Sequence, residues 1–159
     1  NQAREEIDGY FHSEIGFNSR MTNLEAAMGL AQMERLGEFL KKKTVFNKIY
    51  REELNDIDEI SFQEEYPGAR NSCWMSCILF TKNYDIQTFK DTLKKKGVTT
   101  RRIFTPVVDF PPYKDCKKGA FPNSYTIYER GICLPSSTLN REDDIRRVCG
   151  HVKRALSEQ

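Results

Sequence analysis

Two polar residues near the start of the chain have the types and spacing to bind an anion. Asn18 and Arg20 lie on a turn opened by Gly16, directly before a predicted helix. An Asn amide offers donors and an acceptor, and an Arg guanidinium makes paired hydrogen bonds to a carboxylate or phosphate. The N–H groups of a helix start also favour anions. From spacing alone the commoner interpretation is a capped turn and a solvated surface charge, so both interpretations stay open.

The helix that must position these residues begins at a capping box. Thr22 is followed three positions later by Glu25, so each side chain can bond a backbone N–H of the first turn. Good helix formers dominate residues 24–43, and apolar residues recur every three to four positions. The pattern continues to Leu54, which predicts one long or kinked helix. Gly29 predicts close packing against another backbone.

The remaining chain alternates between strand and helix patterns. Strands are expected at 73–80, 98–104 and 132–134. Helices are expected at 85–96, after 121–124 to about 131, and from 140 to about 156. Strand 98–104 is expected to pair with strand 73–80. This order predicts an α+β fold with a long helix and a small, mainly antiparallel sheet covered by helices.

Composition excludes several classes of protein. The 159 residues are 30% charged and 38% hydrophobic with a net charge of +2, which argues against nucleic-acid binding. The five cysteines form no C-x-x-C and only two histidines are present, so neither a metal site nor a disulfide framework is expected. No apolar run is long enough to span a membrane. We therefore expect reduced thiols and a cytoplasmic location.

The segment 16–36, GFNSRMTNLEAAMGLAQMERL, resembles the signature G-[YF]-N-x-R-M-[TS]-N-x-x-A-A-x-G-x-x-Q-[LM]-x-x-[LA] of the DegT/DnrJ/EryC1/StrS aminotransferases. Further elements follow in the family's order: G-[IV]-x-[TS]-R at 97–101, F-P-x-[AS] at 121–124 and G-x-x-L-P at 131–135. The resemblance covers nearly the whole chain. It implies the C-terminal small domain of a fold-type I aminotransferase at 23–159, with 1–22 leading from a large domain.

The resemblance implies a chemistry that this chain does not carry alone. Such enzymes use pyridoxal phosphate (PLP) to pass an amino group, with glutamate the expected donor, to a nucleotide-linked keto-deoxy-sugar. They act as homodimers, in which the residues matching Asn18 and Arg20 reach the cofactor and substrate of the neighbouring subunit. The Schiff-base lysine precedes the signature, and none of the lysines here lies in the matching region. We therefore assign no catalytic residue to this chain and expect it to be inactive alone.

Four residues are candidates for the substrate wall: Arg101, Phe104, Val108 and His12. Val108 stands where relatives commonly carry His, so the sugar specificity of a relative does not transfer. Each of the others has a structural alternative. Arg101 could form an ion pair, Phe104 could pack in the core, and His12 could stabilise a turn.

Two other functions fit the same residues. A sugar 3-dehydratase of this fold has His in place of the Schiff-base lysine, a difference that lies outside this sequence. A non-catalytic dimerisation or interaction module would keep the fold without cofactor affinity. For the enzyme interpretations we expect exposed apolar surface where the large domain docks.

Overall fold

The computed structural model describes residues 14–17, 21–116 and 119–158. Its centre is a four-stranded antiparallel sheet in the order β1-β2-β4-β3. The strands are β1 (Ile60–Phe62), β2 (Ser76–Phe80), β3 (Arg101–Arg102) and β4 (Gly131–Leu134). All four residues of β4 are buried, which suits a central strand, whereas exposed Arg101 lies on an edge strand.

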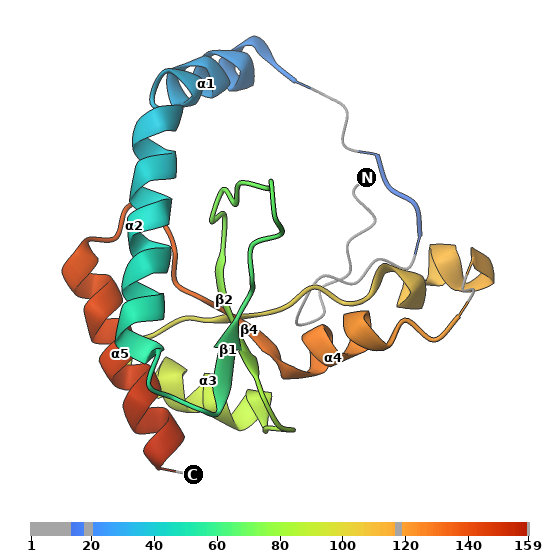
Figure 1. The fold of residues 1–159 in the computed structure, drawn as a ribbon. Coiled ribbons are helices and arrows are strands. Elements are labelled where there is room, and N and C mark those ends of the chain that lie inside the picture. The colour runs from blue at the N-terminus through green and yellow to red at the C-terminus, as the bar shows by residue number, and fades with distance from the viewer. Residues whose placement is uncertain (1–13, 18–20, 117–118, 159) are drawn as a thin grey trace.

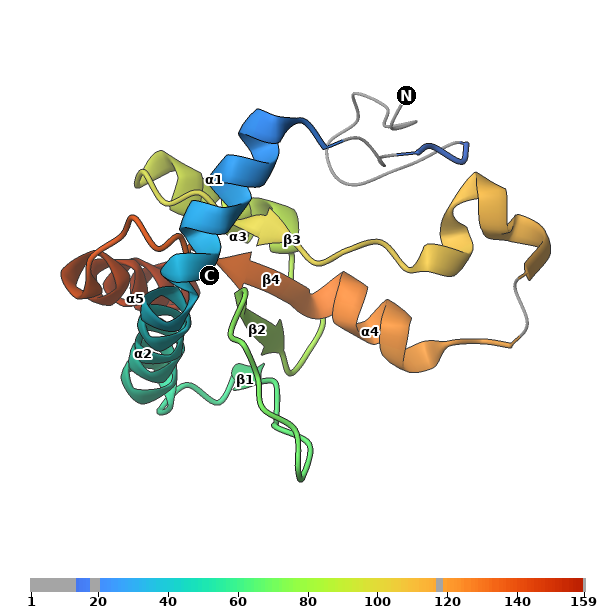
Figure 2. The ribbon, with the colours of Figure 1, turned by 90° about the horizontal axis from the view of Figure 1, so that it is seen from above.

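Three helices cover one face of this sheet (Figure 2). They are α2 (Leu36–Leu54), α3 (Ile86–Lys95) and α5 (Glu142–Ser157). Alternate residues of β2 are buried, and two of them, Ile78 and Phe80, form one hydrophobic core with the helices. The fully buried aromatic residues of that core are Phe46, Tyr50, Phe80 and Phe89. The short helix α4 (Pro122–Arg130) lies on the opposite side of the sheet from α2 and α5.

The predicted long helix is broken into two parts. The capping box of Thr22 and Glu25 begins α1 (Asn23–Glu34) as expected, and the chain turns at Arg35 before α2 (Figure 1). At the turn, φ of −102° and ψ of 4° take Arg35 out of the helical range. The kinked form of the predicted helix is therefore the one that occurs.

Helix α1 buries none of its residues. Its exposed apolar side chains include Leu24 at 73%, Leu30 at 64% and Met28 at 62% of their maximal area. This confirms the expected exposed apolar surface. A Cβ added at Gly29 would meet no atom of the described chain within 4 Å, so the close packing expected there has no partner within these residues.

Three sequence expectations differ from the structure. Strand 98–104 shrinks to Arg101–Arg102 and pairs with β4, because the apolar β4 takes the central place beside β2. Strand β1 was not expected, since it lies in an acidic, turn-rich segment and depends on pairing with β2. Helix α5 begins after Arg141 rather than Asn140, because the Asp144 carboxylate accepts from the Arg141 N–H at 2.9 Å.

Candidate functional site

The three described residues of the predicted substrate wall come from β3 and the loop after it. Phe104 is 44% exposed, so it is not a core residue. Its ring stacks on Trp74, with centroids 6.2 Å apart and an interplanar angle of 18°. Val108 is half-buried in the 3-10 helix η1 (Val107–Asp109). Arg101 is exposed on β3. His12, Asn18 and Arg20 lie outside the described residues.

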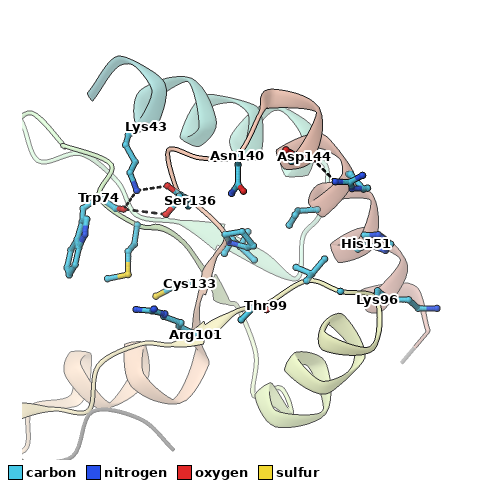
Figure 3. A pocket seen from close by; sticks show the side chains of 18 residues that line it. Lys43, Trp74, Lys96, Thr99, Arg101, Cys133, Ser136, Asn140, Asp144 and His151 are labelled. Carbon is cyan, nitrogen blue, oxygen red and sulfur yellow. Dashed lines mark hydrogen bonds and ion pairs between the residues drawn. The ribbon is translucent and has the colours of Figure 1, made fainter. Parts of the chain in front are cut away.

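An open cavity of about 930 Å³ lies where the end of β4, the turn between α3 and β3, and helix α5 meet (Figure 3). Arg101 and Trp74 line it, whereas Phe104 and Val108 are not among its lining residues. Of the predicted wall residues, Arg101 thus lines the cavity directly. Phe104 lies at its edge, because its ring stacks on Trp74.

The cavity is lined by more positive than negative side chains. Lys96, Arg147 and His151 join Arg101 and Lys43 around it, and Asp144 is the acidic residue of the lining. Asp144 already accepts hydrogen bonds from Arg147 and from the Arg141 N–H. Burial, followed by the charges of Arg154, Lys96 and Arg147, lowers the pKa of His151. The lining therefore suits an anionic group.

The sequence alone did not single out these basic residues. Lys43 comes from α2, and Arg147 and His151 come from α5, more than ninety residues later. One signal was available: Arg147 and His151 are four positions apart, which places them on the same side of a helix. Their approach to Lys43 and Arg101 depends on how α5 packs against α2 and the sheet.

Lys43 has a structural role at the cavity. Its ammonium donates to the Trp74 carbonyl at 2.8 Å and to the Ser136 carbonyl. It thereby joins α2 to the segment before β2 and to the segment after β4. Burial lowers the pKa of Lys43. The Lys43 ammonium therefore uses two of its three hydrogen-bond donors within the chain.

We expect Lys43→Met to lower the free energy of unfolding by about 1–3 kcal/mol, because two carbonyl groups lose their charged donor. Urea unfolding followed by circular dichroism measures the change. Lys41→Met, at an exposed position of the same helix, is the matched control and should stay within about 0.5 kcal/mol of the parent. Equal losses in the two variants would contradict the role assigned to Lys43.

The start of α1 does not by itself form a cradle for an anion. At the start of α1 the Thr22 N–H donates to the Glu25 carboxylate, and the Glu25 N–H donates to the Thr22 hydroxyl. These bonds occupy two donors that an anion would need, and they place a carboxylate beside them. An anion at this turn therefore depends on side chains of the preceding residues. Among the described residues, no group of three or more His, Cys, Asp or Glu could hold a metal ion, and no helix could cross a membrane.

Comparison with known proteins gives a consistent result. The model of the DegT/DnrJ/EryC1/StrS aminotransferase family matches residues 1–153. The chain is 32% identical over 147 residues to a GDP-perosamine synthase of Vibrio cholerae, covering 91% of this chain and 40% of that protein. It is 30% identical over 150 residues to a GDP-perosamine synthase of Escherichia coli O157:H7, covering 94% of this chain and 40% of that protein.

The fold also matches solved structures. The aminotransferase TlmJ from Streptoalloteichus hindustanus superimposes with a TM-score of 0.77 at 20% identity, over 94% of this chain and 40% of that one. This likeness confirms the helix and antiparallel-sheet fold expected from the sequence. The chain spans about 40% of the length of the two curated relatives, the GDP-perosamine synthases.

Proposed function

Because the chain belongs to the DegT/DnrJ/EryC1/StrS aminotransferase family, we propose that it is the C-terminal part of a PLP-dependent sugar aminotransferase. The complete enzyme would transfer an amino group, with glutamate the proposed donor, to a nucleotide-linked keto-deoxy-sugar in the cytoplasm. The family match over residues 1–153 is the observation that carries this proposal.

The exposed apolar side chains of α1 support the proposed organisation. Residues 1–22 would lead from a large cofactor-binding domain, and residues 23–159 would form the small domain. The apolar side chains Leu24, Met28, Leu30 and Met33 are each more than 60% exposed in the described chain. Surface of this kind is costly to leave in water, so docking of the large domain or of a second subunit would stabilise it.

The proposed roles of the residues are to bind and to orient. PLP supplies the electron-withdrawing ring on which amino groups are exchanged. Asn18 would contact its phosphate across a homodimer interface by a side-chain hydrogen bond, since the start of α1 is closed by its own capping box. Arg20 would line the cavity that holds cofactor and substrate. Arg101, Phe104, Val108 and His12 would form part of the substrate wall. An apolar Val108 would exclude water and make no hydrogen bond to a sugar hydroxyl.

The test begins with the coding region upstream of Asn1 and continues with the complete protein. We expect a lysine in a cofactor-binding context there, absorbance from bound PLP, and formation of an amino-sugar from a GDP-linked keto-deoxy-sugar and glutamate. Arg20→Ala should weaken PLP binding about 10- to 100-fold, the equivalent of one charge-assisted hydrogen bond. Arg70→Ala, on an exposed loop of the described chain, serves as the control and should bind PLP normally.

Two outcomes would replace this proposal. A histidine in place of the lysine, together with loss of water from the sugar instead of amination, would make the complete protein a sugar 3-dehydratase. A complete protein that dimerises without PLP affinity would be a non-catalytic dimerisation module.

A further inference from the structure

Two cysteines face each other across the centre of the sheet. Cys77 on β2 and Cys133 on β4 are directly opposed in the antiparallel register, and their Sγ atoms are 3.5 Å apart. Opposed residues of an antiparallel pair have Cα atoms about 4.5–5.5 Å apart. That range lies inside the roughly 4.4–6.8 Å that a disulfide requires. The backbone therefore places the two thiols where a small side-chain movement would join them.

The pair lies on the face of the sheet turned away from the helical core. In β2 the buried Ser76 and Ile78 face the core, and Cys77 between them is half-buried on the other face. Cys133 lines the open cavity, where Figure 3 shows it beside Arg101. Cys77 is not among the residues that line the cavity, but it is only half-buried, so a small reagent would reach its thiol without unfolding of the sheet.

The surroundings make the two thiols unequal. The hydrogen bond between them lowers the pKa of Cys77 and raises the pKa of Cys133. The charge of Arg101, the register partner of Cys133 on β3, partly offsets the rise in the pKa of Cys133. Cys77 is half-buried and Cys133 is buried, so Cys77 is the thiol that a reagent reaches first, and a second thiol is in contact with it. This is the arrangement of an attacking and a resolving cysteine.

The other cysteines lack this arrangement. Cys73 and Cys149 are buried, and burial raises the pKa of each thiol. Cys116 is exposed in the 3-10 helix η2 (Pro111–Cys116). Burial protects the first two from oxidants, and Cys116 comes from an element outside the sheet.

We propose that Cys77 and Cys133 form a redox-active dithiol site, which a small disulfide such as oxidised glutathione converts into a cross-strand disulfide. The Cys77 thiolate attacks one glutathione sulfur, the glutathione S–S bond breaks, and one glutathione leaves. Cys133 then gives up its proton and attacks the Cys77 sulfur, and the second glutathione leaves. The two cysteines lose two protons and two electrons, and one oxidised glutathione becomes two reduced molecules. This site does not depend on the proposed aminotransferase function.

Oxidation would have a measurable effect on the fold. The bond would join positions that are 56 residues apart in the chain and would hold the two central strands together. A cross-link over such a loop removes conformational entropy from the unfolded chain. We expect the melting temperature of the oxidised chain to exceed that of the reduced chain by about 5–15 °C.

The test oxidises the folded 159-residue chain with oxidised glutathione in native buffer. The chain is then unfolded and alkylated, so that every remaining thiol can react, and is analysed by proteolysis and mass spectrometry. We expect two of the five thiols to become unreactive and one linked peptide pair to join Cys77 to Cys133. Cys77→Ser should abolish the link, whereas Cys116→Ser should leave it intact. Circular dichroism checks that both variants fold.

The same oxidation in denaturant separates native geometry from chance pairing. In the unfolded chain the short Cys73–Cys77 loop should be favoured, so the Cys77–Cys133 link should depend on the fold. A Cys73–Cys77 link in native buffer would overturn the proposal. So would a stable glutathione adduct on Cys77 without a link, or five reactive thiols after oxidation.

Discussion

Gly131→Ala is expected to lower the free energy of unfolding by about 2–3 kcal/mol through overpacking. Gly131 joins α4 to β4 and is buried between them. A Cβ at this position would lie 2.4 Å from the Ile127 carbonyl oxygen and 2.5 Å from Cγ1 of Ile103. The carbonyl belongs to the last turn of α4 and cannot move without breaking helix geometry. The φ of −97° is ordinary, so the cost is steric and not backbone strain.

Gly37→Ala provides the matched control for this prediction. Gly37 lies in α2, where an added Cβ meets nothing within 4 Å of the described chain. Ala favours a helix over Gly by about 1 kcal/mol, so this variant should be more stable than the parent. Urea unfolding of the two variants measures both effects. A loss in Gly37→Ala as large as that in Gly131→Ala would show that space at Gly131 is not the cause.

Alkaline pH is expected to destabilise the chain through buried thiol and phenol groups. Cys149 is 1% exposed on α5, and burial raises the pKa of its thiol to about 12. Burial also raises the pKa of Tyr50. In the unfolded chain a thiol loses its proton at about pH 8.5, so between this pH and 12 the folded state holds a proton that the unfolded state has released. The contribution of the buried Cys149 thiol to the free energy of unfolding is therefore fully present below about pH 8.5, and it is lost as the pH rises toward 12.

The predicted size of the Cys149 contribution is about 3–4 kcal/mol by pH 12. It is measured as the free energy of unfolding in urea at several pH values from 8 upward. Cys149→Ala should be less stable at neutral pH, because it leaves a cavity, yet lose less stability per pH unit above 9. Val148→Ala, the neighbouring buried residue on the same helix, should lower stability by a similar amount at every pH. If the two variants show the same slope with pH, Cys149 is not the titrating group.

Local residue types determined the ends of two helices. The capping box of Thr22 and Glu25 begins α1, and Asp85 accepts from the N–H groups of Gln87 and Thr88 at the start of α3. Gly97 follows α3 with φ of 78°, a conformation that Gly adopts without cost. The two caps could be predicted because each needs partners only two or three residues away. The family signature was likewise readable, since it is a linear pattern.

The candidate site was predicted only in part. Arg101 lines the cavity, and Phe104 reaches its edge by stacking on Trp74. The substrate or cofactor roles proposed for all of these residues remain predictions, as do those of Val108 and of His12, Asn18 and Arg20, the last three of which lie outside the described residues. The basic residues from α2 and α5 were not expected, because helical spacing indicates which side chains share a face and not which element that face meets.

Strand order and the thiol pair were decided by the tertiary structure alone. A strand pattern has a period of two, which tells which residues are buried but not which strand is the neighbour. Packing places β4 between β2 and β3, where its four residues are all buried. That choice brings Cys133 opposite Cys77 and Arg101 beside Cys133. By itself the sequence determined the family and the local helix signals. The sheet partners and cavity neighbours depend on burial between distant segments, which no local pattern encodes.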